Sequence, residues 1–500
     1  MIRYNLTALI LSAILLSGCA QTQQNLSHSP QNQIFVKPQP DITYRNTLQE
    51  VENLLDLPDE QFDIAKAVLI VTSTINDATD IQANCALLDR YADKIRPKIE
   101  SKRNVSDKVN ALSDFLWAEG FHCPKPLWKD YSSREYLNVW RMEDTDFSRL
   151  LAEKKGNCLS LSILYISLAR RTGIPLHSVA IPQHIYVRHT ENGENLNIET
   201  THGGYFFPDD EYKEKIALRG FNAEYQHQLS DKQLLGCYLL NIGALYNMMN
   251  NTATSLDYNL LALKTGLQDP DLLSNIANNY LLLGSLTYAE KYFLMSLKKQ
   301  PQSGYIYAQL GYIAWMQNNY NKSHIYLTTA ISLLEKVEKR RILAPKEEDK
   351  TSFAQACLAM TYNYRANVFL DTDDPYSALE HAKKALDLWQ RRSFAVGYYN
   401  YRGVVDIYRT LGKIYTRLED YDKSISYYNK ALAQLNPEDK KPTKRMQGLL
   451  LSELAASHRE KGDSSNAEKY FLEAQTIFKS LGDENRYLKV MNMYRGESDR

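Results

Sequence analysis

The chain has 500 residues, which at roughly 150 residues per domain corresponds to about three domains. Its 59 Lys and Arg balance 59 Asp and Glu, and this neutrality argues against a nucleic-acid-binding protein, which needs a basic surface. A hydrophobic fraction of 44% with 24% charged residues excludes a disordered chain and a polytopic membrane protein, and six Cys are too few for a disulfide scaffold.

The first residues have the pattern of a signal peptide. One positive charge, at Arg3, precedes an apolar run from Leu6 to Leu16. This run is too short to span a bilayer, for which about 20 apolar residues are needed, and has the length of a signal-peptide core. It ends in Leu16-Ser17-Gly18-Cys19, which resembles the lipobox of bacterial lipoproteins. An ordinary secretory signal with an incidental Cys is the alternative.

The lipobox resemblance implies a compartment. Residues 1–18 would be a cleaved lipoprotein signal peptide, and Cys19 would carry the lipid at the mature N-terminus. Ala20, in place of Asp, favours the outer membrane, so we expect an outer membrane lipoprotein that faces the periplasm of a bacterial cell envelope. Residues 19–41 are rich in Gln, Asn, Ser and Pro and predict a flexible tether. We expect no membrane span in the mature protein.

A helical segment and a cysteine motif follow the tether. Apolar residues recur at helical spacing from Thr43 to about Leu151. The next stretch reads KKGNCLSLSILYISLARRTGIP, in which Gly156-Asn157 can start a helix and Gly173 with Pro175 ends it. Cys158 is therefore predicted at or near the N-terminus of a buried helix. The partial positive charge of a helix N-terminus favours the thiolate, which is the nucleophilic form.

The segment after this helix is predicted to form strands. Asn192-Gly193 is a typical tight turn, and it would join two strands into a hairpin. The hairpin can bring His184 and Glu199 next to the Cys158 helix. These residues would supply a nucleophile, a general acid–base and a carboxylate that orients the imidazole. The predicted strands are 178–181, 185–188 and 196–199.

At this point the sequence resembles a known family. The run from GNC to IPQHIYVR, followed by LNIETTHGG, is similar to the bacterial transglutaminase-like domain of the papain-like cysteine hydrolase superfamily. The resemblance covers about residues 45–215 and implies an α+β fold with catalytic Cys158, His184 and Glu199. The family usually has Asp at the third position, where this sequence has the longer Glu199. Some members of the superfamily have lost these residues, whereas this chain keeps all three.

Each of these residues also has a structural interpretation. Cys158 could be an inert buried thiol, His184 a hydrogen-bonded core histidine and Glu199 a solvated carboxylate at a strand end. His177, His189 and His202 lie nearby, but their spacing fits no zinc motif, so we expect neither a metal site nor a cofactor. Whether Cys85 and Cys123 form a disulfide in an oxidising compartment stays open.

The last half of the chain contains an internal repeat with a period of 34 residues. It closely resembles the tetratricopeptide repeat (TPR), in which small residues allow two helices to approach closely. Three units align as Gly243, Ala277 and Gly311, as Ser255, Ala289 and Ser323, and as Ala262, Ser296 and Ala330. Three later units contain Ala366, Ala378 and Ala385, then Gly412, Ser424 and Ala431, and then Ala455, Ala467 and Ala474.

The later units depart from a uniform period. Ala330 and Ala385 are 55 residues apart, and the surplus falls near the charged stretch from Glu335 to Lys350, which predicts longer helices or loops there. Most of the 35 Tyr lie in this half, as expected for interhelical packing and for a concave face. Tyrosines considered for that face are Tyr398, Tyr399, Tyr401, Tyr427 and Tyr428.

The predicted fold class is an α+β transglutaminase-like (papain-like) domain followed by an all-α TPR solenoid. The domain is expected at residues 42–220, six repeats at 235–482, and a capping helix and tail at 483–500. One hypothesis is a lipid-anchored cysteine hydrolase or acyltransferase acting on amide or peptide bonds, whose repeats bind a protein or peptide. The alternative is a non-catalytic scaffold or assembly factor that uses the transglutaminase-like fold for docking. No nucleic-acid partner is expected.

Overall fold

The computed structural model describes residues 42–124, 145–181, 184–218, 226–343, 351–391, 399–435 and 441–495. The chain divides into two compact units, residues 1–302 and 303–500. The predicted signal peptide, Cys19 and the tether lie outside the described residues. No helix among the described residues is both long enough and apolar enough to cross a membrane.

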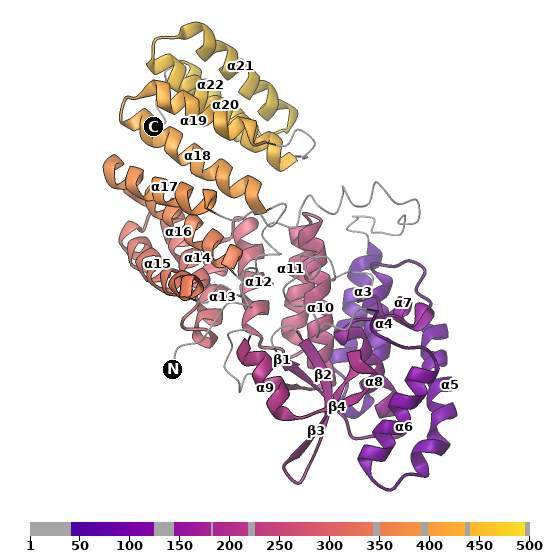
Figure 1. The fold of residues 1–500 in the computed structure, drawn as a ribbon. Coiled ribbons are helices and arrows are strands. Elements are labelled where there is room, and N and C mark those ends of the chain that lie inside the picture. Colours follow the sequence, from indigo (N-terminus) through magenta and orange to yellow (C-terminus); the bar gives the residue numbers. More distant parts are fainter. Residues whose placement is uncertain are drawn as a thin grey trace. The chain divides into compact units, whose positions relative to one another are not determined.

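In its described residues the first unit begins with helices and then forms an antiparallel sheet (Figure 1). Its strands have the spatial order β4-β3-β2-β1-β5, and every neighbouring pair is antiparallel. The strands are β1 (His177–Ile181), β2 (His184–Glu191), β3 (Glu194–Glu199), β4 (Tyr205–Phe207) and β5 (His227–Leu229). The helices before the sheet are α3 (Ile42–Leu55), α4 (Ile64–Ser73), α5 (Ile81–Glu100), α6 (Val105–Ala118), α7 (Phe147–Glu153) and α8 (Cys158–Thr172).

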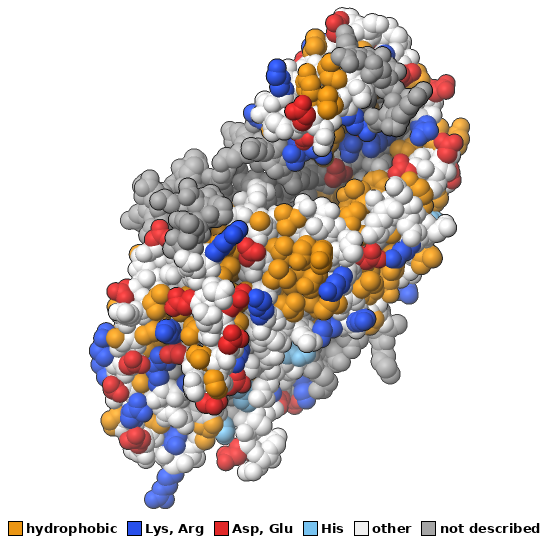
Figure 2. Space-filling model, turned by 180° about the vertical axis from the view of Figure 1, so that it is seen from behind, with side chains coloured by type: hydrophobic (Ala, Val, Ile, Leu, Met, Phe, Trp, Pro, Cys, Tyr) orange, Lys and Arg blue, Asp and Glu red, His pale blue; other side chains and the backbone are white. Residues whose placement is uncertain are grey.

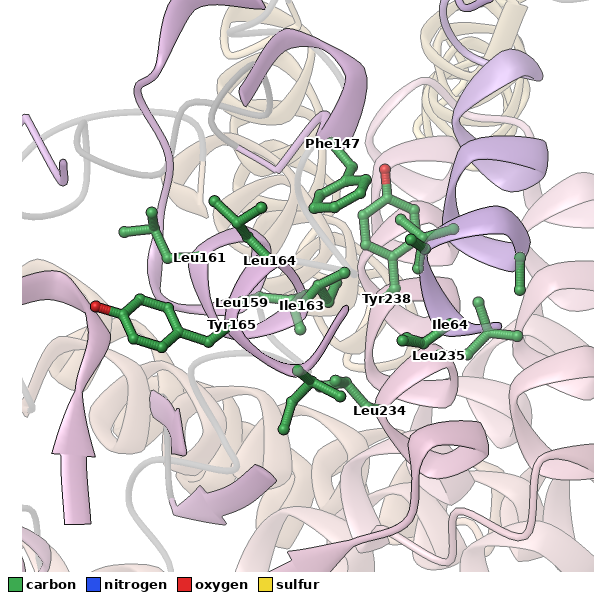
Figure 3. Packing of buried hydrophobic residues seen from close by; sticks show 14 of the residues in the cluster. Ile64, Phe147, Leu159, Leu161, Ile163, Leu164, Tyr165, Leu234, Leu235 and Tyr238 are labelled. Atoms are coloured by element: carbon green, nitrogen blue, oxygen red, sulfur yellow. The ribbon is translucent and has the colours of Figure 1, made fainter. Parts of the chain in front are cut away.

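Helix α8 lies in the middle of the core of this unit. Every residue from Cys158 to Ala169 is buried, so the helix is covered on all sides. Figure 3 shows its side chains packed between residues of α4, α7 and α10 (Asp231–Met248), among them Ile64, Phe147 and Tyr238. Buried serines on α8 find hydrogen-bond partners: Ser167 donates to the carbonyl of Ile163 at 2.6 Å, and Ser162 donates to the carbonyl of Ile185 on β2 at 3.4 Å.

Helix pairs follow the sheet, as the repeat predicts. Helices α10 to α13 belong to the first unit and α14 to α22 to the second. In the described residues α10 to α21 form six consecutive antiparallel pairs, followed by α22 (Figure 1). Their bounds are α11 (Thr252–Lys264), α12 (Pro270–Leu282), α13 (Leu286–Lys299), α14 (Gly304–Met316), α15 (Tyr320–Leu343), α16 (Thr351–Asp371), α17 (Pro375–Gln390), α18 (Tyr399–Arg417), α19 (Tyr421–Ala433), α20 (Lys441–Glu460), α21 (Ser464–Ser480) and α22 (Glu484–Arg495).

The small residues of the repeat lie where paired helices touch. Ser255, Ala289 and Ser323 are fully buried, and so are Ala262 and Ala330. The 24 residues of α15 account for part of the extra length between the third and fourth units. The predicted fold class, a small α+β domain followed by all-helical repeats, is therefore confirmed.

The structure describes the side chains of two of the five tyrosines considered for a concave face. The Tyr428 side chain is buried against Gly412, and the Tyr427 ring stacks on Tyr415 with centroids 5.5 Å apart. The side chains of Tyr398, Tyr399 and Tyr401 lie outside the described residues. On the face drawn in Figure 2, acidic and basic side chains are scattered over the described surface, and hydrophobic side chains gather in patches between them.

Candidate active site

A tight loop places Cys158 at the start of α8. Lys154 ends α7 in a left-handed conformation, with φ of 64°. A Cβ atom at Gly156 would lie 2.5 Å from Ser160 Oγ and 2.9 Å from Leu150 Cδ1, so only glycine fits there. The Asn157 side chain caps α8 by accepting hydrogen bonds from the N–H groups of Leu159 and Ser160.

This cap leaves the first N–H group of the helix available. The N–H groups of Leu159 and Ser160 are engaged by Asn157, whereas no hydrogen bond from the Cys158 N–H is found among the described residues. The thiol and this N–H group therefore lie together at the positive end of the helix. Cys158 itself is only 2% exposed.

The hairpin of β2 and β3 positions the other two predicted residues. Asn192 and Gly193 have φ of 52° and 82°, as a tight hairpin turn requires. The register pairs Val187 with Ile198, and both of these side chains belong to the main core. Because side chains alternate along a strand, His184 and Glu199 lie on the opposite face.

The structure brings Cys158, His184 and Glu199 together. His184 Nε2 lies 2.7 Å from Glu199 Oε2, and the Cys158 thiol is close enough to His184 to help raise the pKa of its imidazole. Because Nε2 faces the carboxylate, Nδ1 is the ring nitrogen left for the thiol. His184 is 3% exposed and Glu199 is fully buried.

Electrostatics favour the charged pair of histidine and carboxylate. Burial lowers the pKa of His184, but the Glu199 carboxylate and the Cys158 thiol outweigh burial and raise this pKa to about 9. Burial raises the pKa of Glu199, but His184 and Thr201 outweigh it and hold the pKa below the usual range of a carboxyl. At neutral pH the imidazolium form is thus favoured beside the thiol.

Comparisons with known proteins identify two kinds of domain in the chain. Residues 82–236 match the model of the transglutaminase-like superfamily, and residues 357–436 match a tetratricopeptide repeat model. The chain contains a transglutaminase-like domain and tetratricopeptide repeats. Cys158, His184 and Glu199 all lie within the matched transglutaminase-like region.

Two curated proteins from Xylella fastidiosa, strains Temecula1 and 9a5c, are similar to part of the chain. Both are called UPF0162 protein, and each is 25% identical over 33% of this chain. The alignments cover 54% and 55% of their lengths, so the chain spans about half the length of the curated relatives it matches.

Several solved structures are also similar. The APC/C hetero-tetramer Cut9-Hcn1 has a TM-score of 0.43 and 14% identity, covering 91% of this chain and 68% of that chain. PilF of Pseudomonas aeruginosa has a TM-score of 0.33 and 15% identity, covering 51% of this chain and 99% of that chain. The type IV pilus biogenesis factor PilW has a TM-score of 0.35 and 14% identity, covering 49% of this chain and 94% of that chain.

Two residues of the transglutaminase-like domain hold the carboxylate and were not predicted from the sequence. Tyr212, on α9 (Asp209–Leu218), donates to Glu199 Oε2 at 2.9 Å. Thr201 donates to Glu199 Oε1 through its hydroxyl at 2.6 Å and through its N–H at 3.1 Å. Thr201 could have been found, because it lies only two residues after Glu199 in the chain. Tyr212 carries no comparable signal in the sequence.

The Tyr212 ring is itself held by the sheet. It stacks on Tyr186 with centroids 4.0 Å apart, and Tyr186 lies on the same face of β2 as His184. Arg188 donates to the Tyr186 hydroxyl at 2.7 Å and forms an ion pair with Asp209 at 3.0 Å. The carboxylate of Glu199 is thus supported by a stack of side chains along one face of the sheet.

The histidines near the site have contacts of their own. No group of three or more His, Cys, Asp or Glu suited to a metal ion occurs among the residues that the structure describes. His189 Nδ1 bonds the carbonyl of Pro175 at 2.9 Å, and His177 borders a separate cavity of about 430 Å³ beside Arg170 and Lys232. Cys85, Cys123, Cys158, Cys237 and Cys357 form no disulfide with one another.

Proposed function

We propose that the transglutaminase-like domain is a cysteine hydrolase or acyltransferase that acts on an amide or peptide bond. The observation that carries this proposal is the constellation of Cys158 at a helix N-terminus, His184 near its thiol and Glu199 bonded to His184. A thiolate is the reactive form of cysteine, and a neighbouring imidazolium with a buried carboxylate stabilises it.

The reaction would have two stages. In the resting pair the Cys158 thiol has already given its proton to His184, and the thiolate sulfur adds to the amide carbonyl carbon, whose C=O π bond opens to a tetrahedral oxyanion. His184 then returns the proton to the leaving nitrogen as the C–N bond breaks, which leaves a thioester on Cys158. Water or an amine, deprotonated by His184, attacks the thioester and releases the acid or the new amide with the free thiol.

The N-terminus of α8 would stabilise the oxyanion. The N–H of Cys158 donates no hydrogen bond within the described part of the chain, and it adjoins the attacking sulfur. In a water-excluded site such a donor stabilises developing charge without needing to reorganise. Hydrolysis is the reaction we favour, with water as the acceptor.

The remaining parts of the proposal concern location and partners. The lipobox at Cys19 and the tether 19–41 support an outer membrane lipoprotein facing the periplasm. The helix pairs α10 to α21 support a role in binding a protein or peptide, because arrays of this kind present extended binding surfaces. In this proposal the repeats deliver the substrate of the cysteine site.

One observation favours a second candidate function, the non-catalytic scaffold. Cys158, His184 and Glu199 are at most 3% exposed, so a substrate would need a local opening to reach the thiol. A domain used only for docking would need no such opening.

A thiol-reactive probe distinguishes the two candidates. Cys158 is expected to react with iodoacetamide at pH 6–7, well below the pKa of a free thiol near 8.5, and this reactivity should be lost in His184→Ala. Cys237 is a matched internal control, because burial raises the pKa of its thiol and no histidine pairs with it in the described residues. Equal reactivity of Cys158 and Cys237 would remove the case for catalysis.

A further inference from the structure

One repeat carries an arginine where the other repeats have an aliphatic side chain. The residue before the first small residue of the pattern is buried and aliphatic in five of the six helix pairs, and in the fourth pair it is Arg365, on α16. A guanidinium at a position of the helix interface loses hydration that a leucine would not lose. The five aliphatic residues are Ile242, Ile276, Leu310, Leu411 and Leu454.

The Arg365 guanidinium has no carboxylate partner among the described residues. Its Nη2 lies 3.4 Å from His324 Nε2, and its central carbon lies 5.6 Å from the centre of the Phe369 ring. Its Nε atom is buried and has no hydrogen-bond partner among the residues that the structure describes. The positive charge of Arg365 thus lies beside a histidine and an aromatic ring, and the guanidinium keeps N–H groups that can donate to a ligand.

Two histidines from neighbouring helices flank the same ring. His324 on α15 and His381 on α17 lie 5.8 Å and 5.0 Å from Phe369, between ring centroids. Burial and the charge of Arg365 lower the pKa of His324, and burial is also the main cause that lowers the pKa of His381. His381 Nδ1 bonds the carbonyl of Ser377 at 2.8 Å.

The carboxylates that face this cluster are already engaged. Glu335 on α15 accepts a hydrogen bond from the Tyr362 hydroxyl at 2.6 Å. Glu380 on α17 pairs with Lys384 at 2.7 Å, and the Lys384 ammonium lies over the Tyr362 ring. The positive charge of Arg365 therefore remains without a partner of opposite sign within the described part of the second unit.

We propose that Arg365, His324 and His381 form a binding site for a carboxylate group of a peptide partner. The planar guanidinium can donate two parallel hydrogen bonds to a carboxylate, and a histidine that becomes protonated on binding adds a further donor. The guanidinium carries one positive charge and the histidines are neutral before binding, so the site matches the single negative charge of a carboxylate. The proposal rests on the proposed function of the repeats in binding a peptide, and it names the chemical group that is recognised.

The test uses the full chain, purified in detergent, with histidines labelled at ¹³Cε1 for NMR titration. The probes are acetate, a free tripeptide Ac-Ala-Ala-Ala, its C-terminal amide, and Ac-Ala-Asp-Ala amide. Binding should raise the pKa of His324 and His381, because a carboxylate stabilises the imidazolium. The two peptides with a single carboxylate show whether a C-terminus or an acidic side chain is preferred, and either result supports the site.

Arg365→Leu restores the residue type of the other repeats and should therefore fold. Arg365→Leu is expected to weaken acetate and peptide binding about tenfold or more. Arg365→Lys keeps the positive charge but lacks the planar guanidinium that donates two parallel hydrogen bonds, so it should weaken binding less. Arg391→Leu, which removes an exposed arginine paired with Asp387 on α17, is the control and should bind as the wild type.

Two outcomes would overturn the proposal. One is an unchanged pKa of both histidines at saturating acetate, or the same shift in Arg365→Leu as in the wild type. The other is a shift produced by inorganic phosphate and absent with acetate. Failure of the proposed function is distinct, because it would appear as an unreactive Cys158 or as the absence of any retained partner while acetate still binds near Arg365.

Discussion

The Glu199 carboxylate accepts four hydrogen bonds and is fully buried. Its donors are His184, the Tyr212 hydroxyl, and both the hydroxyl and the N–H of Thr201. The extra methylene of glutamate relative to the family's usual aspartate does not prevent contact, since the carboxylate reaches His184 at 2.7 Å. A buried carboxylate with this many donors stays ionised and holds the imidazole in one orientation.

The variant Glu199→Gln tests the charge of this group while keeping its shape. The amide would point its NH₂ group toward a donor and would no longer favour imidazolium, so the pKa of His184 should fall from about 9 to below 6.5. The unfolding free energy should drop by about 1–3 kcal/mol, and alkylation of Cys158 at pH 7 should slow by about tenfold or more. Urea unfolding and timed iodoacetamide labelling measure the two effects.

A glutamate on the same hairpin provides the control. Glu191 lies 3.6 Å from His189, but its side chain is 69% exposed, so the pair is screened by water. Glu191→Gln should leave unfolding and labelling within error of the wild type. Equal effects of Glu191→Gln and Glu199→Gln would show that the buried pair has no special role.

The ionisation of His184 also predicts a pH dependence of stability. Its pKa is raised on folding from near 6.5 to about 9, so its contribution is fully present below pH 6.5 and is lost as the pH rises through 9. This contribution is on the order of 3 kcal/mol. The difference in unfolding free energy between the wild type and His184→Gln should therefore shrink between pH 6.5 and 9. A difference that stays constant or grows over this range would contradict the assignment.

Tyr212 is predicted to be a positioning residue. Tyr212→Phe keeps the ring stacked on Tyr186 and removes one hydrogen bond to Glu199, so stability should fall by about 1 kcal/mol. With one donor fewer, the pKa of Glu199 should rise, and the acid limb of the Cys158 alkylation profile should move to higher pH. Tyr205→Phe, at a ring that is 73% exposed, is the control. An unmoved acid limb would limit Tyr212 to a packing role.

Local chemistry made the three central residues predictable. Asn157 as a helix cap and Asn192-Gly193 as a hairpin turn are short-range signals, and together they locate Cys158, His184 and Glu199. Tyr212 could not be predicted in this way, because its position depends on how α9 packs across the sheet. The Arg365 site was not predicted either, since the difference between Arg365 and the aliphatic residues of the other repeats is seen only when the helix pairs are aligned by their small residues.

At the scale of helices, a repeated glycine contact determines how closely paired helices pack. A Cβ added at Gly243, Gly311 or Gly412 would lie 2.6–2.7 Å from the side chain 16 residues later. Those side chains are Asn259, Leu327 and Tyr428. The same pair of positions is thus in contact in three different helix pairs, although the second residue differs in size and polarity.

The variant Gly412→Ala tests this contact. The added methyl group would overlap the Tyr428 ring, whose Cε1 lies 2.7 Å from the Cβ position, so α18 and α19 should be destabilised by about 1–3 kcal/mol. Tyr428→Leu removes the ring, and the double variant should lose less stability than the sum of the single variants. Urea unfolding of all four proteins gives the coupling energy. Strict additivity would mean that the two positions do not determine the helix spacing.

At the scale of the whole molecule, long-range contacts organise the first unit. Tyr238 on α10 bonds Thr72 on α4 at 2.8 Å, and Lys264 on α11 pairs with Glu52 on α3 at 2.6 Å. The first two helix pairs of the repeat therefore share one compact unit with the sheet. The period of 34 residues predicts the helix pairs. It does not predict this division, because the division depends on contacts between residues more than 160 positions apart in the chain.

The attachment of the chain to a membrane remains a prediction, and it rests on Cys19. Several acyl chains on this residue would anchor the protein stably, whereas a single chain would bind the membrane only marginally. Cys19→Ser should abolish labelling by radioactive palmitate and move the protein from the membrane pellet to the soluble fraction. Cys158→Ser, which alters the candidate nucleophile and leaves the lipobox intact, should stay in the pellet and keep the label. If Cys19→Ser remained in the pellet after a high-salt wash, the interaction with the membrane would have to come from another part of the chain.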